Sequence, residues 1–218
     1  ITPNEAFWHY VNLKLYSNIN YRNAEKYIVK RLTRDLPDGG YYHGIHHTMD
    51  VCEAVERIAL WEGLKGEDLY LLKTAALFHD AGFIHSYESN EPIGAEMAKE
   101  MLPSFGYTKE QIEQVIELIE ATKIPHNPKN KLEEIMCDAD LDYLGRQDFH
   151  PIAETLRKEL VEFGKIPDNN LVWYEMNVKF LSAHKYFTDS AKARRAPEKL
   201  KRIEEFKEKL ELAEKHSD

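Results

Sequence analysis

The sequence has little of several features that would assign it to a simple class. Two cysteines in 218 residues are too few for the disulfide framework of a small secreted protein, and they lack the paired spacing of a zinc site. No apolar run is long enough to span a membrane, and no signal-peptide pattern opens the chain. Internal repeats and Gly/Ser-rich linkers are absent, and period-two alternation is rare. These absences predict a cytoplasmic, all-α protein without a membrane partner.

The charge balance is acidic. Lys and Arg number 29 against 38 Asp and Glu, a formal net charge of -9. This argues against a nucleic-acid partner, which needs a basic surface. An anionic small molecule would have to be held by a metal ion and a few local cations. Hydrophobic content and length suit one domain over residues 1–218. The chain begins at Ile1 rather than Met, which leaves open that a longer protein contains it; oligomeric state is not indicated.

Helical signals recur along the chain and predict a bundle of about ten helices. The turn Pro125-His126-Asn127-Pro128 is expected to be stiff and exposed, and residues 81–90 to form an irregular loop. Both cysteines fall inside predicted helices as buried thiols. Pro197 is placed near the start of the last helix, which carries a stripe of Leu200, Ile203, Leu210 and Ala213. The expected helices are 4–16, 21–36, 45–62, one ending at 79–80, 91–102, 108–122, 132–144, 149–163, 169–185 and 197 to about 216.

The dipeptide His79-Asp80 stands where apolar residues are expected. The inward phase of the preceding apolar helix runs through Leu69, Leu72 and Ala76, and its next step is His79. A histidine and a carboxylate at such a position are costly to desolvate unless they are paired or bind a cation. The pair therefore points to a metal site.

Two other segments supply candidate partners. His43, His46 and His47 crowd five residues, and His43 and His47 share a face if the helix has begun there. In the predicted helix 132–144, Asp140 falls on the apolar face, whereas Asp138 and Asp142 are expected to face water or cap neighbours.

Together these residues form one mixed nitrogen and oxygen ligand set. Two imidazoles and two carboxylates leave room for water in an octahedral site, which suits Mn, Fe, Mg or Zn without choosing among them. Each residue alone has an ordinary structural explanation as a hydrogen-bonded core polar group, but four unrelated ones on one chain are harder to explain. The set is His47, His79, Asp80 and Asp140.

This order of residues resembles the HD-domain superfamily of metal-dependent phosphohydrolases. Three segments resemble, in turn, the first motif of cyclic-nucleotide phosphodiesterases, the central His-Asp motif, and the closing Asp motif of small bacterial HD hydrolases. The resemblance covers about residues 41–146, with the helices of 149–216 expected to pack on this core. The segments are Tyr42-His43-Gly44-Ile45-His46-His47-Thr48-Met49-Asp50-Val51, Ala76-Leu77-Phe78-His79-Asp80-Ala81-Gly82 and Asp138-Ala139-Asp140-Leu141-Asp142-Tyr143-Leu144-Gly145.

The resemblance implies an HD-like helical bundle that hydrolyses a small, nucleotide-like phosphoester. It implies one divalent ion on the four ligands, which polarises the phosphoryl group and activates a water that Asp80 orients. His43 matches the phosphodiesterase histidine that protonates the leaving oxygen. The Tyr42-His43 pair favours a diester over a monoester.

Several positions depart from the family patterns. Phe83 stands where phosphodiesterases carry a further His, and His85 is in a different register. Glu91 and Lys123 lie in the regions where dinuclear members place extra histidines, so one metal is favoured and a second is left open. The paired acids of alarmone hydrolases are absent after the His-Asp pair. Glu91 is a candidate bridging or substrate-side group, although an acid there also suits a helix N-terminus.

Cations and aromatic residues supply further candidates. Lys123 and Arg146 are candidate phosphate contacts, with exposed solubilising cations as the alternative. An aromatic stripe could wall a base-stacking pocket, but such stripes are more often core. The stripe is Trp173, Tyr174, Met176, Phe180, Tyr186 and Phe187.

Two alternative functions follow from other uses of this kind of fold. An iron oxygenase needs additional His ligands between His79 and Asp140, where only His85 and His126 occur. A non-catalytic nucleotide-sensing or metal-stabilised module of a larger signalling protein would bind without turnover, although such a module has no need of buried acids.

Overall fold

The computed structural model describes residues 19–215, and within them it contains α-helices and 3-10 helices and no strand. The expected helix over 4–16 lies outside these residues. The bounds agree with the predicted helices to within a few residues, except in α7 and α10. The α-helices are α2 (Tyr21–Asp35), α3 (Ile45–Trp61), α4 (Glu67–Phe78), α5 (Asn90–Met101), α6 (Lys109–Ala121), α7 (Lys131–Asp140), α8 (Phe149–Glu162), α9 (Asn170–Ala183) and α10 (Asp189–Lys215).

Side-chain caps begin several of these helices. Asn20 accepts a hydrogen bond from Asn23 N at the start of α2, and Asn130 accepts from two backbone N–H groups at the start of α7. Thr108 and Gln111 form a reciprocal capping box at the start of α6. Such caps satisfy N–H groups that have no partner inside a helix.

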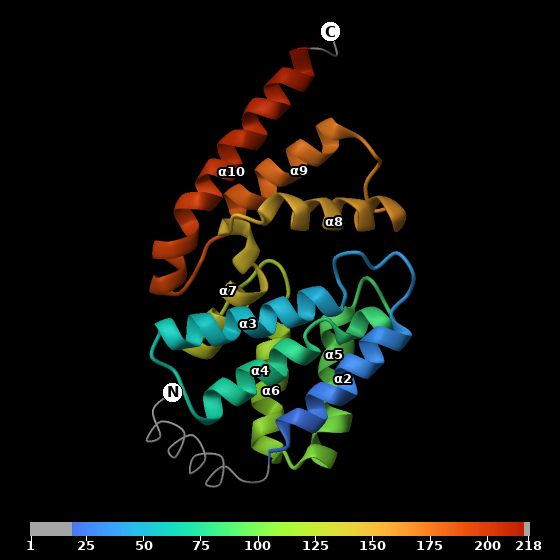
Figure 1. Cartoon of the computed structure of the whole chain (residues 1–218), viewed down its shortest axis with the longest axis vertical. Coiled ribbons are helices and arrows are strands. Elements are labelled where there is room, and N and C mark those ends of the chain that lie inside the picture. Colours follow the sequence, from blue (N-terminus) through green and yellow to red (C-terminus); the bar gives the residue numbers. More distant parts are fainter. Residues whose placement is uncertain (1–18, 216–218) are drawn as a thin grey trace.

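Two apolar clusters build the core, one at each end of the molecule in Figure 1. Helices α2 to α7 enclose the first, which is centred on fully buried side chains such as Phe78 and Leu72. The 3-10 helix η3 (Asp142–Gly145) and helices α8 to α10 enclose the second, around Phe149 and Leu181. Within the first group of helices, α3 and α7 lie on the side that faces α8 to α10 (Figure 1). In residues 19–215, no helix is both long and apolar enough to cross a membrane.

The prediction for helix 132–144 was wrong in its second half. Helix α7 ends at Asp140 and the chain continues as η3, so the helical phase does not carry over to Asp142. Asp142 is 1% exposed and accepts hydrogen bonds from Arg57 on α3 and Arg195 on α10, at 2.9 and 2.6 Å. It joins the two ends of the molecule instead of facing water.

Asp138 is also buried, at 0% exposure, because the segment before α10 covers it. Of the two outcomes expected for it, facing water or capping a neighbour, the structure shows the second. Its carboxylate accepts from the backbone N–H groups of Phe187 and Thr188, each at 2.8 Å, and from the Thr188 hydroxyl at 2.7 Å. Burial raises the pKa of Asp138 to about 6, although these hydrogen bonds oppose the rise. Asp138 thereby positions the start of α10.

The last helix begins eight residues before Pro197, which was predicted to lie near its start. Pro197 lies inside α10, and the Thr188 hydroxyl accepts from Ala191 N at the true N-terminus. The expected stripe was also partly wrong, because Leu200 is 59% exposed while Ile203 is buried. Contacts of α10 with α9 and η3 offset the hydrogen bond that Pro197 cannot donate. The predicted end near His216 lies outside the described residues.

A buried cation joins α9 to α10. Lys199 is 6% exposed, and its Nζ donates to the carbonyl of His184 and, at 3.2 Å, to His184 Nδ1. Burial, then the positive charge of Lys199 and the proximity of His126, lower the pKa of His184 to about 3. His184 is therefore neutral at pH 7 and accepts from Lys199.

Replacing His184 by Asn is expected to reduce the acid sensitivity of the fold. In the unfolded chain His184 titrates near its usual pKa, so the unfolded state binds more protons between about pH 3 and 6.5 and stability falls as pH is lowered through that window. Urea unfolding at pH 7.5 and pH 5 should show that the wild type loses about 1–2 kcal/mol more than the variant. His150→Asn, at a half-exposed histidine, is the matched control. Equal losses in wild type and His184→Asn would contradict the assignment.

Candidate metal centre

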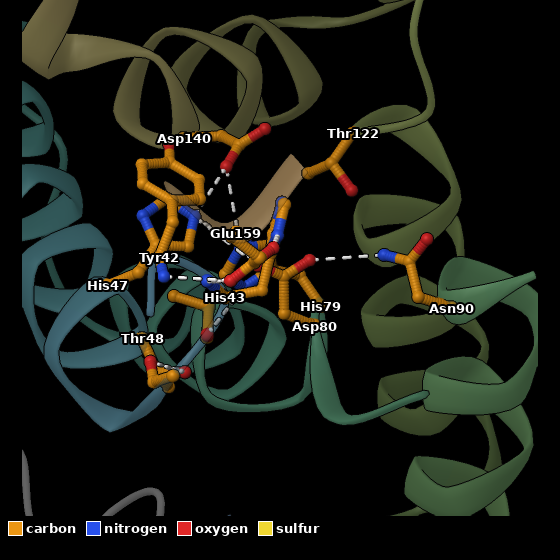
Figure 2. Close-up of polar contacts among 12 residues, drawn as sticks. Tyr42, His43, His47, Thr48, His79, Asp80, Asn90, Thr122, Asp140 and Glu159 are labelled. Atoms are coloured by element: carbon orange, nitrogen blue, oxygen red, sulfur yellow. Dashed lines mark hydrogen bonds and ion pairs between the residues drawn. The ribbon is translucent and has the colours of Figure 1, made fainter. Parts of the chain in front are cut away.

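Four side chains from three helices converge at the junction of the two apolar clusters. His47 comes from the first turns of α3, His79 and Asp80 follow the last residue of α4, and Asp140 ends α7. His47 Nε2 lies 3.3 Å from Asp80 Oδ2 and 3.2 Å from Asp140 Oδ1, and His79 Nε2 lies 3.2 and 3.4 Å from the same two oxygens. Figure 2 shows these groups directed toward one another. The predicted ligand set is brought together.

The donor atoms fit a cation better than they fit one another. His79 Nδ1 lies 2.8 Å from the carbonyl of Ala76 and donates to it, which leaves the Nε2 lone pair facing inward. His47 Nε2 lies only 3.3 Å from His79 Nε2. Asp80 Oδ2 is buried without a good hydrogen bond. Two imidazole nitrogens and a carboxylate oxygen within 4.8 Å of one another form a metal-ligand geometry at His47, His79 and Asp80.

The electrostatics of the site favour a positive charge at its centre. Burial alone would lower the pKa of His79, but the carboxylates of Asp80 and Asp140 raise it well above its usual value. Burial alone would raise the pKa of Asp140, but the nearby imidazoles of His126, His47 and His79 hold it well below its usual value. A divalent ion would take the place of a proton on His79 and satisfy both carboxylates.

Two glycines allow the site to form where α4 ends. A Cβ on Gly82 would lie 1.9 Å from the carbonyl oxygen of Asn90, and one on Gly94 would lie 2.5 Å from that of Phe78. Helix α5 therefore packs directly against the turn that carries Asp80. This contact lets Asn90 Nδ2 donate to Asp80 Oδ1 at 3.1 Å. Asn90, which the sequence did not single out, holds one oxygen so that the other faces the ligands.

His43 lies beside this site, but not for the reason that its spacing suggested. Helix α3 begins at Ile45, so His43 precedes the helix and shares no helical face with His47. Its Nδ1 hydrogen-bonds Glu159 Oε1, and Glu159 Oε2 accepts from the backbone N–H groups of Tyr42 and His43 at 2.7 and 3.0 Å. Because an ionised carboxylate only accepts, His43 Nδ1 donates and Nε2 is left for other partners.

Glu159 is a functional candidate that the sequence analysis missed. It is fully buried, yet His43 and the two backbone donors lower its pKa below the usual value against the effect of burial. Tyr87 donates to the same carboxylate at 3.1 Å. Its signal was present but weak: Glu159 stands three residues after Leu156, at the edge of the apolar face of α8. Nothing in the sequence links it to His43, which lies 116 residues earlier.

The surrounding positions explain the departures from the family patterns. The ring of Phe83 stacks on His43, with centroids 4.1 Å apart, and so supports the imidazole instead of supplying a ligand. His85 is exposed. The turn that contains His126 is exposed at Pro125 and Asn127, as expected, but the His126 side chain points inward and is only 4% exposed.

His126 supports Asp140 from outside the ligand group. Its Nε2 donates to the carbonyl of Thr122 at 3.0 Å and lies 3.7 Å from Asp140 Oδ2. The turn folds back because α6 and α7 pack together, which the flanking prolines did not reveal. Within the described residues, the compact metal-ligand group contains neither His85 nor His126.

A cavity of about 450 Å³ opens beside the ligands. His43, His47, Asp80 and Asp140 line it, as do the predicted substrate-side residues Glu91 and Lys123. Arg146 does not line it. Its guanidinium is held by Asp50 at 2.6 Å and by Asp148 at 2.5 Å, so the structure gives no support to Arg146 as a phosphate contact. Trp173, Met176 and Phe180 of the aromatic stripe line the cavity as well.

The comparison with protein families agrees with this geometry. Residues 44–142 match the HD domain, a range that contains all four candidate ligands. Residues 44–142 of this chain therefore form an HD domain. The fold resembles a crystal structure described as a predicted HD superfamily hydrolase from an uncultured Thermotogales bacterium, with 24% identity, a TM-score of 0.57, and coverage of 90% of this chain and 93% of that one. No curated protein sequence matches the chain. Helices α8 to α10 lie beyond the matched HD domain. Helix α8 supplies Glu159, and α8 and α9 supply much of the cavity wall.

Proposed function

We propose that this HD-domain protein is a metal-dependent phosphohydrolase that favours a phosphodiester over a phosphomonoester. The observation that carries the proposal is that His43, with Nδ1 anchored by buried Glu159, lines the same cavity as the candidate metal ligands. His43 is suited to donating a proton, and an ion on the candidate ligands would stabilise the negative charge of a phosphoryl group.

The candidate ion belongs on His47, His79, Asp80 and Asp140. A divalent ion on this ligand set supplies Lewis-acid polarisation of a phosphoryl oxygen and lowers the pKa of a bound water. Asp80 has Oδ1 held by Asn90 and Oδ2 directed at the ligands, so it is suited to orienting the attacking water. His79 is held by Ala76, which keeps its ligand nitrogen in place.

His43 supplies the second half of the reaction. Water adds its oxygen to phosphorus and loses one proton to solvent, and the P–O bond to the leaving group breaks. Protonated His43 gives its Nε2 proton to the departing alkoxide and regains one from solvent. Glu159 accepts from His43 Nδ1 throughout, which fixes the tautomer and stabilises the protonated imidazole. An alkoxide leaving group needs such a proton in either ester. The preference for a diester rests on the resemblance of the Tyr42-His43 segment to the first motif of phosphodiesterases.

Metal-supplemented hydrolysis tests the proposal. With Mn²⁺, bis(p-nitrophenyl) phosphate should be turned over faster than p-nitrophenyl phosphate, and EDTA should abolish both activities, with recovery on adding the metal back. Absence of turnover on either ester with Mn²⁺, Fe²⁺, Mg²⁺ or Zn²⁺ would reject the phosphohydrolase. The iron oxygenase or the binding module would then be examined by metal content and nucleotide binding.

A further inference from the structure

The cavity beside the candidate ligands has two chemically different ends. The ligands and His43 form one end, and helices α8 and α9 form the opposite wall. That wall belongs to the second apolar cluster, outside the matched HD domain. Its apolar lining consists of Ala153, Leu156, Leu160, Trp173, Met176 and Phe180. A ligand that spans the cavity therefore needs a charged end and an apolar end.

The lining offers little to a highly charged ligand. Lys123 is the one Lys or Arg that lines the cavity in the described part of the chain, whereas Glu88 and Glu91 add negative charge at the same surface. The net charge of -9 adds to this repulsion. Nearby arginines are held by acids, as Arg146 is by Asp50 and Asp148. One phosphoryl group with a single negative charge fits this lining, and a polyphosphate does not.

The wall also offers few partners to a nucleobase. On α8 and α9, Asn177 is the one lining side chain with an amide, and one of its Nδ2 hydrogens is donated to the carbonyl of Trp173 at 2.8 Å, which leaves its second N–H and its Oδ1. Beyond it, the Trp173 indole is the only other polar group of the wall. A base carries several donors and acceptors, and each one buried without a partner weakens binding. An alkyl or aryl group has no donors or acceptors that burial would leave without a partner.

We propose that the substrate is a phosphodiester with one negative charge whose organic group is apolar, alkyl or aryl, and lies against α8 and α9. This rests on the proposed phosphohydrolase function, and it replaces the nucleotide-like substrate implied by the family resemblance with one whose organic group is apolar. The phosphoryl group lies at the ligands within reach of Lys123. The volume of about 450 Å³ is in the range of sites that enclose small apolar ligands.

Binding of inert analogues tests the substrate class apart from turnover. Dialkyl phosphinates keep one negative charge and have no P–O ester bond to hydrolyse. By calorimetry on the Mn²⁺-loaded protein, methyl(octyl)phosphinate should bind at least about tenfold more tightly than dimethylphosphinate, since each buried methylene contributes roughly fourfold. It should also bind more tightly than a hydrolysis-resistant phosphorothioate analogue of cyclic AMP. Equal binding of the two phosphinates, or tighter binding of the nucleotide analogue, would overturn the proposal.

A polar substitution in the apolar wall tests where the octyl group of the probe binds. Met176→Gln keeps the side-chain length and should weaken methyl(octyl)phosphinate about fourfold or more while leaving dimethylphosphinate unchanged. Glu175→Gln, on the exposed side of the same helix, should change neither. If Met176→Gln leaves the octyl probe unaffected, the apolar end lies elsewhere and the proposal fails. Chain-length-dependent binding without hydrolysis of any ester would reject the phosphohydrolase while keeping the assignment of the apolar wall.

Discussion

Asp80→Asn is expected to lower phosphodiester hydrolysis by on the order of 10³-fold or more, because it removes an oxygen ligand and the group suited to orienting water, together several kcal/mol of transition-state stabilisation. The substitution keeps the shape of the side chain and an acceptor for Asn90 Nδ2. Activity is measured with bis(p-nitrophenyl) phosphate and Mn²⁺. Circular dichroism checks the helical fold.

Metal binding separates a lost ligand from a damaged fold. Mn²⁺ should raise the melting temperature of the wild type, since a ligand that binds only the folded state stabilises it, and should raise that of Asp80→Asn far less. The exposed Asp68 on α4 provides Asp68→Asn as the matched control, which should behave as wild type. If Asp80→Asn stayed within threefold of wild-type activity, the proposed ligand set would be wrong.

His43→Ala is expected to lower hydrolysis of dialkyl phosphodiesters by about 10²–10⁴-fold, the usual contribution of a general acid. The loss should be much smaller for bis(p-nitrophenyl) phosphate, because a nitrophenolate departs without a proton. A dependence on the leaving group distinguishes proton donation from a merely structural role. An equal loss for both esters would contradict His43 as the proton donor.

Glu159→Gln tests how His43 is held. The amide oxygen of Gln can still accept from the backbone N–H groups of Tyr42 and His43, but its NH₂ cannot accept from His43 Nδ1. We expect the same leaving-group pattern as His43→Ala with a smaller loss, and a shift of the pH–rate profile. Glu162→Gln on the same helix is the matched control. Glu159 is thus a positioning residue that acts through His43.

The local pattern of the sequence was sufficient for most helices and for the burial of the candidate ligands. His79, Asp80 and Asp140 follow from one physical rule, since a charged group on an apolar helix face must find a counter-charge or a cation. The periodic segments that became α3 and α6 were also well predicted, because helical periodicity depends on residues a few positions apart. The prediction of one domain over 1–218 stays a prediction.

Contacts between distant segments decided the rest. The end of α7 at Asp140 and the cover supplied by the segment before α10 buried Asp138 and Asp142, for which local phase had left water or a neighbouring cap as alternatives. The fold also joined His43 to Glu159 across 116 residues. By itself the sequence determined the helices and the inward-facing ligands, because these depend on periodicity and local desolvation. Only the tertiary structure decided how His43 is held and what lines the cavity, because those depend on helices α8 and α9 closing over the ligands.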